Sequence, residues 1–249
     1  MTAAISVRQL KKSFGLTDVI RGVDLEVRQG DVHALIGPNG AGKSTFFNLL
    51  SGAFPPSSGE IHLLGERVDG LPPETIHRKG LARSFQVSNI FHNMSVFENV
   101  RCACFRNADA GHVFWRAAGS IGEANTRAEE VVEMVGLAEL RHEMAGALPY
   151  SSQRALEIGM TIAANAPVVL LDEPTAGMSN TETEHMIELI RTVSRDRTLV
   201  IVEHDMSVVF GLADRISVLV YGQVIATGRP DEIRENPKVR ESYLGEEAA

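Results

Sequence analysis

The residues from Gly37 to Thr45 form the strongest chemical signal in this sequence. They read Gly-Pro-Asn-Gly-Ala-Gly-Lys-Ser-Thr and match the pattern G-x-x-x-x-G-K-[ST]. Glycines let such a loop curl until successive backbone N–H groups point at phosphate oxygens, and the helix that follows adds its positive end. An accidental match in a glycine-rich turn is the alternative. The loop reading is favoured because an apolar run precedes it and helix-compatible sequence follows.

Two residues of this loop have a defined chemical role. Lys43 reaches the β- and γ-phosphates of a nucleotide, and the Ser44 hydroxyl ligates Mg²⁺. The loop therefore predicts Mg²⁺ and a nucleoside triphosphate as cofactors, and the family resemblance given below implies that the nucleotide is ATP. The predicted nucleotide-binding residues are Gly37, Pro38, Asn39, Gly40, Ala41, Gly42, Lys43, Ser44 and Thr45.

Two adjacent carboxylates, Asp172 and Glu173, directly follow an apolar run, and Pro174 prevents a strand from continuing there. An aspartate at a strand end near such a loop holds Mg²⁺, usually through water. The next carboxylate points differently and polarises the attacking water as a general base. The alternative is a solvated acid pair. Because a phosphate-binding loop occurs in the same chain, we predict a metal ligand and a catalytic base.

His204 follows Glu203 at the end of another apolar run. A lone histidine is more often structural than catalytic. Here its expected position beside the acid pair favours a hydrogen bond from the imidazole to the γ-phosphate.

Three apolar runs must position these groups: 32–36, 168–171 and 199–202. Continuous apolar runs are typical of parallel strands that are covered on both faces. Each run ends in one of the polar clusters described above. Ligands bind beyond the carboxyl ends of such strands, so we expect all three clusters to meet at one edge of a sheet.

Other segments predict a different architecture around this core. Apolar residues alternate loosely over 5–10 and again over 23–27, which indicates half-buried antiparallel strands. Residues 215–227 resemble a hairpin that turns at 221–223.

A helical segment is expected between the strands, at approximately 87–162. Ser95 and Glu98 have the spacing of a helix-capping box. Further along, apolar residues share one helical face; they are Ala128, Val131, Val132 and Val135.

Composition sets outer limits on the class of protein. The chain has 249 residues and a formal net charge of −8, which does not favour a nucleic-acid-binding surface. No apolar stretch approaches the roughly 18 residues that span a bilayer, and the first residues do not suggest a secretory signal. The two cysteines, Cys102 and Cys104, are weak evidence for a metal site or a disulfide, so we expect a reduced cytosolic protein.

The phosphate-binding loop, the acidic strand end and the late histidine, arranged around a helical insertion, resemble the nucleotide-binding subunits of ABC transporters along essentially the whole chain. The resemblance implies an α/β P-loop NTPase fold: a mostly parallel RecA-like core, an N-terminal antiparallel β subdomain and an inserted helical subdomain. All of 1–249 would then form one nucleotide-binding domain.

Three further residues or segments take their roles from this resemblance. Gln86 matches the Q-loop, where a glutamine senses Mg²⁺ and links to the membrane subunits. Phe14 stands where the family stacks an aromatic ring on adenine, although a phenylalanine at this position suits a core equally well. Residues 176–179 occupy the position of the D-loop.

The signature segment of the family is similar to 148–157, which read Leu-Pro-Tyr-Ser-Ser-Gln-Arg-Ala-Leu-Glu. The general pattern is Leu-Ser-Gly-Gly-Gln, whereas branched-chain amino-acid importers commonly have Leu-Pro-Tyr-Gly-Gln-Gln-Arg-Arg-Leu-Glu. The chain therefore resembles the larger ATPase subunit of that branch. Phe114-Trp115 lies in an insertion that resembles the same branch.

The chain departs from the pattern of the branch at several positions. Ser151 and Ser152 replace glycine and glutamine, and the D-loop ends in Ser179 rather than an acid or asparagine. The resemblance implies that Ser151, Ser152 and Gln153 face a γ-phosphate bound by another subunit. Ser151 then either crowds that approach, since glycine permits backbone geometries that serine resists, or supplies a replacement donor.

The resemblance also implies partners: a second ATPase subunit, identical or related, two transmembrane permeases and, indirectly, a solute-binding protein. It places the chain at the cytoplasmic face of the inner membrane, with branched-chain amino acids or related amide or aromatic solutes as cargo. Three alternatives remain. They are a soluble non-transport ATPase of this family, a lipopolysaccharide-export ATPase, and a binding subunit that does not hydrolyse ATP.

Overall fold

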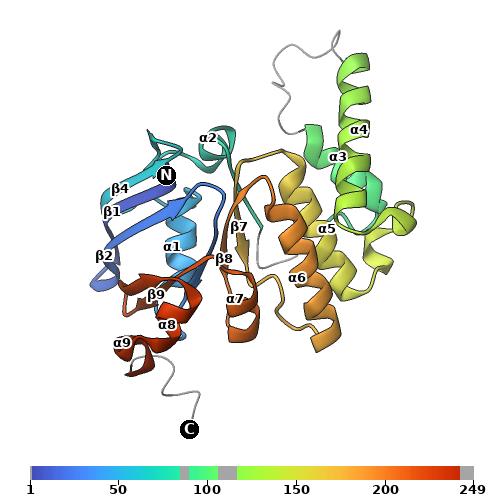
Figure 1. The fold of residues 1–249 in the computed structure, drawn as a ribbon. Coiled ribbons are helices and arrows are strands. Elements are labelled where there is room, and N and C mark those ends of the chain that lie inside the picture. The colour runs from blue at the N-terminus through green and yellow to red at the C-terminus, as the bar shows by residue number, and fades with distance from the viewer. Residues whose placement is uncertain (1, 85–89, 106–116, 242–249) are drawn as a thin grey trace.

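The computed structural model describes residues 2–84, 90–105 and 117–241. Within these residues, an antiparallel sheet lies on one side, a mostly parallel sheet lies in the middle, and helices α3 to α6 pack on the other side (Figure 1). This arrangement confirms the predicted α/β fold class.

The antiparallel sheet contains both N-terminal segments that were predicted as strands. Its strand order is β2-β1-β4-β5. The bounds are β1 Ala3–Phe14, β2 Thr17–Arg28, β4 Ser58–Leu63 and β5 Glu66–Arg67. Val7 pairs with Leu25 across β1 and β2 and with Ile61 across β1 and β4. All three side chains are buried, so this sheet turns one apolar face inward.

The second sheet has the strand order β10-β9-β3-β8-β7-β6. All neighbours in it are parallel except β9 and β10, which form the hairpin. The bounds are β3 Val32–Ile36, β6 Leu81–Arg83, β7 Val168–Asp172, β8 Thr198–Val202, β9 Arg215–Val220 and β10 Gln223–Gly228. The three apolar runs are thus adjacent parallel strands, and their polar clusters meet at one edge of the sheet, as predicted.

Helices cover both faces of this sheet. Their bounds are α1 Lys43–Leu50, α2 Pro73–Arg78, α3 Val96–Cys104, α4 Ala117–Met134, α5 Tyr150–Ala163, α6 Asn180–Ser194, α7 Met206–Leu212, α8 Pro230–Glu235 and α9 Pro237–Val239. Two short 3₁₀ helices lie at Ala138–Leu140 and Ala145–Ala147.

Strand β7 shows why its sequence is continuously apolar. Val168 and Leu170 belong to the core that includes α1 and the antiparallel sheet. Val169 and Leu171 belong to the core formed with α5, α6 and α7. Every residue of β7 is buried, because successive side chains of a strand point to opposite faces and both faces are covered.

The helices between β6 and β7 pack against one another and match the predicted pattern. Ser95 and Glu98 form the expected capping box at the start of α3. The predicted apolar face is buried against α3 and α5; it consists of Ala128, Val131 and Val132 of α4, with Val135 just beyond its end.

The hairpin turn is tighter than predicted. Tyr221 and Gly222 alone form it, with φ angles of 46° and 77°, and Gln223 already belongs to β10. Positive φ at both positions is typical of a two-residue turn that suits the twist of the strands. A Cβ on Gly222 would lie 2.2 Å from the carbonyl oxygen of Val19, so the turn also packs directly on β2.

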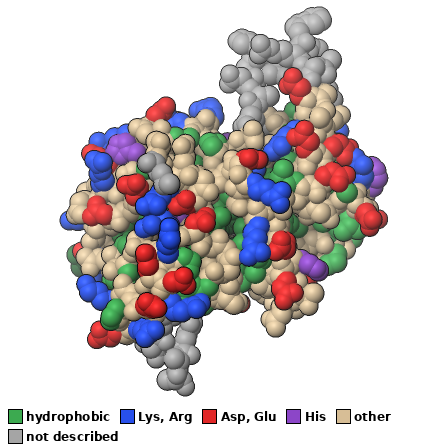
Figure 2. Space-filling model, viewed as in Figure 1, with side chains coloured by type: hydrophobic (Ala, Val, Ile, Leu, Met, Phe, Trp, Pro, Cys, Tyr) green, Lys and Arg blue, Asp and Glu red, His purple; other side chains and the backbone are tan. Residues whose placement is uncertain are grey.

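On the face drawn in Figure 2, acidic and basic side chains lie interspersed, without a continuous basic area. No helix among the described residues is both long and apolar enough to cross a membrane.

Candidate nucleotide-binding and hydrolysis site

The phosphate-binding loop lies between β3 and α1, as its sequence predicts. Gly37 has a φ of 154°, and a Cβ there would lie 1.9 Å from the carbonyl oxygen of Leu219 on β9. Only glycine therefore lets the loop pass this close to the neighbouring strand. Helix α1 begins at Lys43 with no acidic residue in its first turn, so its free N–H groups present positive charge to an anion.

The two loop side chains with predicted chemistry are placed differently. Lys43 is buried, and its ammonium donates to the carbonyl oxygens of Gly37 at 2.5 Å and Pro38 at 3.1 Å. Burial lowers the pKa of Lys43, and the carboxylates of Glu173 and Asp172 oppose that shift. The lysine is thus within electrostatic reach of both acids. Ser44 is exposed, so its hydroxyl is accessible to a ligand.

Asp172 is the last residue of β7 and is only 3 % exposed. Its Oδ2 accepts from Arg83 Nη2 at 3.1 Å, whereas Oδ1 is buried and has no hydrogen-bond partner among the described residues. Burial raises the pKa of Asp172, and the Arg83 guanidinium opposes this. A buried carboxylate oxygen without a partner fits a hydrated cation, since Mg²⁺ retains several waters and binds through one or two carboxylates.

Glu173 has a φ of 49°, a left-handed conformation that is uncommon for a residue other than glycine. Its backbone N–H donates to the Val202 carbonyl at 2.9 Å, which fixes the turn to the end of β8. Its Oε1 lies 2.7 Å from Nε2 of His204. The sequence-predicted base and histidine are therefore brought together as a hydrogen-bonded pair, with His204 the more exposed partner at 45 % against 20 %.

The buried carboxylate of Glu203, which was not predicted as a functional residue, accepts hydrogen bonds from Thr175 and from the backbone of His204. Glu203 is 3 % exposed, and its Oε1 accepts from the N–H of Thr175 at 2.9 Å and from the Thr175 hydroxyl at 2.8 Å. Its Oε2 accepts from the N–H of His204 at 3.3 Å. Burial raises the pKa of Glu203, and the bonds from Thr175 oppose this. Glu203 thus ties the segment after Glu173 to the residue that contacts Glu173.

The signature segment forms the start of α5, and Ser151, Ser152 and Gln153 lie in its first turn, half-buried. The Tyr150 hydroxyl donates to the Ala176 carbonyl at 3.1 Å and accepts from Arg154 Nε at 3.1 Å. This bridge joins the first turn of α5 to residues 176–179.

Two of the departures from the family pattern converge on one carboxylate. Glu182 accepts from the backbone and hydroxyl of Ser179 in a capping box at the start of α6. Hydrogen bonds from Ser179, and a further one from Ser151, hold the pKa of Glu182 below its ordinary value. Ser151 thus lies near enough to Glu182 of α6 to influence its ionisation.

Comparison with known proteins places this geometry in a family. The family model described as "ABC transporter" matches residues 20–176, and one described as "Branched-chain amino acid ATP-binding cassette transporter" matches 223–249. This chain belongs to the ABC transporter family. It is an ATPase of that family, and the phosphate-binding loop and β7 both lie within the matched range.

Full-length relatives agree with this assignment. The chain is 38 % identical to the high-affinity branched-chain amino acid transport ATP-binding protein LivG of Salmonella typhimurium, over 97 % of this chain and 98 % of LivG. It is equally similar to BraF of Pseudomonas aeruginosa, with the same coverage of both chains. A solved nucleotide-free ATP-binding cassette from an ABC transporter superposes with a TM-score of 0.84 and 26 % identity, covering 98 % of this chain and 99 % of that chain.

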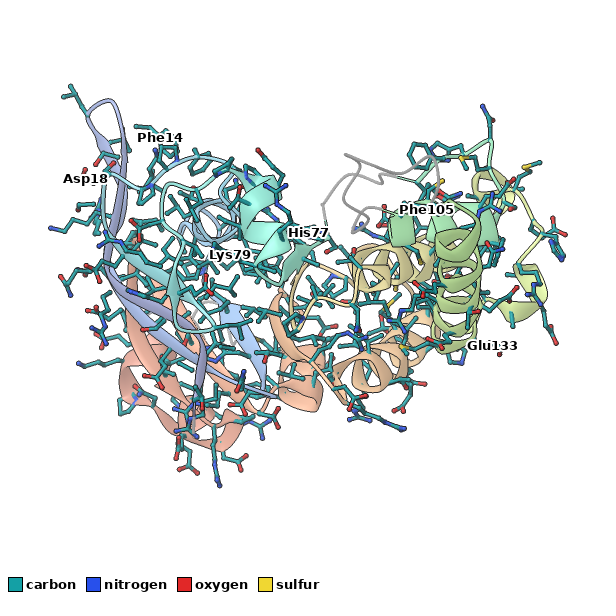
Figure 3. The ribbon with its side chains drawn as sticks, turned by 90° about the horizontal axis from the view of Figure 1, so that it is seen from above. Phe14, Asp18, His77, Lys79, Phe105 and Glu133 are labelled. Carbon is teal, nitrogen blue, oxygen red and sulfur yellow. The ribbon has the colours of Figure 1, made fainter. Side chains whose placement is uncertain are left out.

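Phe14 does not lie in the hydrophobic core, which was one of the two positions considered for it. The ring is 47 % exposed and packs edge-on against Phe54, with centroids 5.3 Å apart and planes at 86°. The ammonium of Lys12 lies 5.0 Å from each centroid. Figure 3 shows Phe14 on the side of the antiparallel sheet, away from Phe105 and Glu133 on the helical side.

Some expectations for the cassette lie outside the described residues. These are the Q-loop glutamine Gln86, the Phe114-Trp115 insertion and the end of the chain. Arg83, Thr175 and Glu203 were not predicted as functional residues. For Glu203 the signal was its position next to His204 at a strand end, and for Arg83 it was the position directly after a short apolar run.

Proposed function

We propose that this chain binds ATP with Mg²⁺ between its 37–45 loop and the edge formed by Asp172, Glu173 and His204, and that hydrolysis there energises import of branched-chain amino acids or a related solute. The observation that supports the site most directly is the pair of Glu173 and His204, 2.7 Å apart, at the same sheet edge as the phosphate-binding lysine. The cargo follows from the relatives LivG and BraF and from the family match at 223–249.

In this proposal each described side chain has one task. The N–H groups of α1 and Lys43 bind the phosphate chain, and Lys43 exchanges the carbonyls of Gly37 and Pro38 for phosphate oxygens. Ser44 and Asp172 would hold Mg²⁺, which neutralises charge on the phosphates. Glu173 orients the attacking water and takes its proton. His204 Nε2, which lies 2.7 Å from Glu173 Oε1, would exchange that carboxylate for the γ-phosphate and donate to it.

The remaining roles come from the family. Gln86 would contact Mg²⁺, and Phe14 would stack on adenine. Ser151, Ser152 and Gln153 would face the γ-phosphate bound by a partner. The partners would be a second ATPase subunit, identical or related, and two transmembrane permeases, with a solute-binding protein acting through them. The chain would lie peripherally on the cytoplasmic face of the inner membrane.

Among the described residues no group of three or more His, Cys, Asp or Glu could hold a metal ion, so Mg²⁺ would depend on the nucleotide for its remaining ligands.

The central test is Glu173→Gln in the assembled transporter. It should leave ATP affinity within about twofold and reduce phosphate release roughly 10²–10⁴-fold, the usual contribution of a general base. Glu188→Gln is the matched control, because Glu188 is an exposed carboxylate of α6 with an ion pair to Arg191. Phosphate release by Glu173→Gln at the rate of the native assembly would remove the base from this proposal.

A second variant tests the binding step. Lys43→Ala removes a charged donor to the phosphates, which should weaken Mg·ATP binding roughly tenfold to a hundredfold. Co-purification with two hydrophobic membrane proteins would separate transport from the soluble alternative. Nucleotide binding without hydrolysis in that complete assembly would identify a binding subunit.

A further inference from the structure

Arg83 forms hydrogen bonds both to Asp172, the proposed metal-binding residue, and to residues of the helix that follows the phosphate-binding loop. It is the last residue of β6, and its side chain is only 8 % exposed. Nη2 donates to Asp172 Oδ2 at 3.1 Å. Nη1 donates in the other direction, to Asn48 Oδ1 at 2.6 Å and to Ser51 Oγ at 2.9 Å.

These contacts join the helix of the phosphate-binding loop to the strand of the acid pair. Asn48 lies on α1, which starts at Lys43, and Ser51 caps the end of that helix. The Arg83 guanidinium also lies 5.7 Å from the ring centroid of Phe47 on the same helix. A planar guanidinium serves both directions at once because its N–H groups point outward in a fixed fork, whereas an ammonium is a single point of charge.

The residue after Arg83 holds the backbone of the same aspartate. The hydroxyl of Ser84 accepts from the N–H of Asp172 at 3.2 Å, and the N–H of Ser84 donates to the Leu170 carbonyl at 2.9 Å. The main chain of Asp172 and one of its carboxylate oxygens are therefore held by Ser84, directly after β6, and by Arg83, the last residue of β6. The other oxygen, Oδ1, is buried with no hydrogen-bond partner among the described residues.

We propose that Arg83 is a positioning residue for Mg²⁺: it holds Asp172 Oδ2 so that Oδ1 alone is presented to the hydrated metal, and it ties that carboxylate to the helix that binds the phosphates. This inference rests on the proposed function. In this role Arg83 acts through its hydrogen bond to Asp172 rather than by contacting the metal itself. Its loss should therefore weaken the response to Mg²⁺ more than the binding of ATP itself.

The experiment measures equilibrium binding of a fluorescent ATP analogue, first in EDTA and then as Mg²⁺ is added. In Arg83→Gln, affinity in EDTA should remain within about twofold of the native protein, because the loop and Lys43 are intact. The Mg²⁺ concentration for half of the metal-dependent change should rise about tenfold, the effect of losing one charge-assisted hydrogen bond. In Arg83→Lys the Mg²⁺ midpoint should lie between those of the native protein and Arg83→Gln, because the positive charge remains while the planar set of guanidinium N–H donors is lost.

Two controls separate this role from general damage. Arg191→Gln removes an exposed arginine that is paired with Glu188, and it should leave both measurements unchanged. Asn48→Ala removes one of the two acceptors of Arg83 Nη1 and keeps the ion pair between Arg83 and Asp172. It should raise the Mg²⁺ midpoint by less than Arg83→Gln does.

Three results would overturn the inference. The first is a native Mg²⁺ midpoint in Arg83→Gln, or in Arg83→Lys if the glutamine variant does not fold. The second is an equal loss of affinity with and without the metal, which would indicate a purely structural arginine. The third is a lowered Mg²⁺ midpoint, which would mean that Arg83 competes with the metal. If Lys43→Ala binds Mg·ATP as tightly as the native protein, the proposed function itself fails. If Lys43→Ala binds Mg·ATP weakly but Arg83→Gln keeps the native Mg²⁺ midpoint, only the role of Arg83 is refuted.

Discussion

Thr175→Val removes one hydroxyl from the buried network behind the proposed base and keeps nearly the same side-chain shape. Thr175 is 7 % exposed, and its hydroxyl donates to Glu203 Oε1 at 2.8 Å. After the substitution, Glu203 keeps the N–H donors of Thr175 and His204. The carboxylate is 3 % exposed, so water cannot readily replace the lost donor.

The size of the effect follows from the type of bond. A hydrogen bond to a charged group is worth about 1.5–3 kcal/mol, so the free energy of unfolding at neutral pH should fall by about 2 kcal/mol. For a domain of this size that lowers the unfolding midpoint by roughly 4–8 °C. ATP turnover should also fall, though less than in Glu173→Gln, because the segment after Glu173 loses part of its anchor while the Glu173 side chain remains.

The loss should depend on pH in a defined direction. Burial raises the pKa of Glu203 above its ordinary value of 4.5, and the Thr175 hydroxyl opposes that rise. The variant therefore has a still higher pKa. Burial of the ionised Glu203 carboxylate lowers the free energy of unfolding at neutral pH. This destabilisation is lost as the carboxylate binds a proton, over the pH range from its pKa in the folded protein down toward 4.5. The difference between native and variant should thus shrink toward about 1 kcal/mol, the worth of a neutral hydrogen bond, as pH falls from 7.5 to 5.

Urea denaturation of both proteins across this pH range is the assay, and groups that titrate equally in both cancel in the difference. Thr192→Val is the matched control, because the Thr192 hydroxyl on α6 donates to the Glu188 carbonyl at 2.9 Å at a more exposed site. It should change the free energy of unfolding by less than about 0.5 kcal/mol. A Thr175→Val difference that is constant with pH, or equal to that of the control, would refute the account of Glu203.

Two other predictions concern the loop and the signature segment. Gly37→Ala places a Cβ 1.9 Å from the Leu219 carbonyl oxygen and should abolish nucleotide binding or folding; native thermal stability and ATP affinity in this variant would contradict it. Tyr150→Phe removes the hydroxyl between Arg154 and the Ala176 carbonyl, and because Tyr150 is 46 % exposed the loss by urea denaturation should be only about 1 kcal/mol. Tyr221→Phe, at a 77 % exposed turn, is its control, and equal effects in the two variants would exclude the Tyr150 bridge.

Local patterns were sufficient wherever one short segment decides the outcome. The glycine and lysine spacing of 37–45 predicted the loop, because the backbone geometry of such a turn depends mainly on residues within it. The apolar runs predicted parallel strands, since a strand covered on both faces needs apolar residues at every position. Ser95 and Glu98 predicted a helix start, because both partners of a capping box lie three residues apart.

Contacts between distant segments could not be read in the same way. Arg83 and Asp172 lie 89 positions apart, and they meet because β6 and β7 are neighbours in the sheet. Nothing in the residues around Arg83 specifies that neighbour. The same holds for Glu203 and Thr175, which are 28 positions apart and are joined only because β7 and β8 end side by side.

By itself, the sequence determined the strand and helix types and the membership in a family of ATPases, and it predicted the phosphate-binding chemistry. The tertiary structure alone decided which of these side chains meet: Arg83 and Asp172, His204 and Glu173. The physical reason is that periodicity and turn chemistry depend on neighbours in the chain. A buried polar side chain instead depends on whichever partner the strand order and helix packing place within about 3 Å of it.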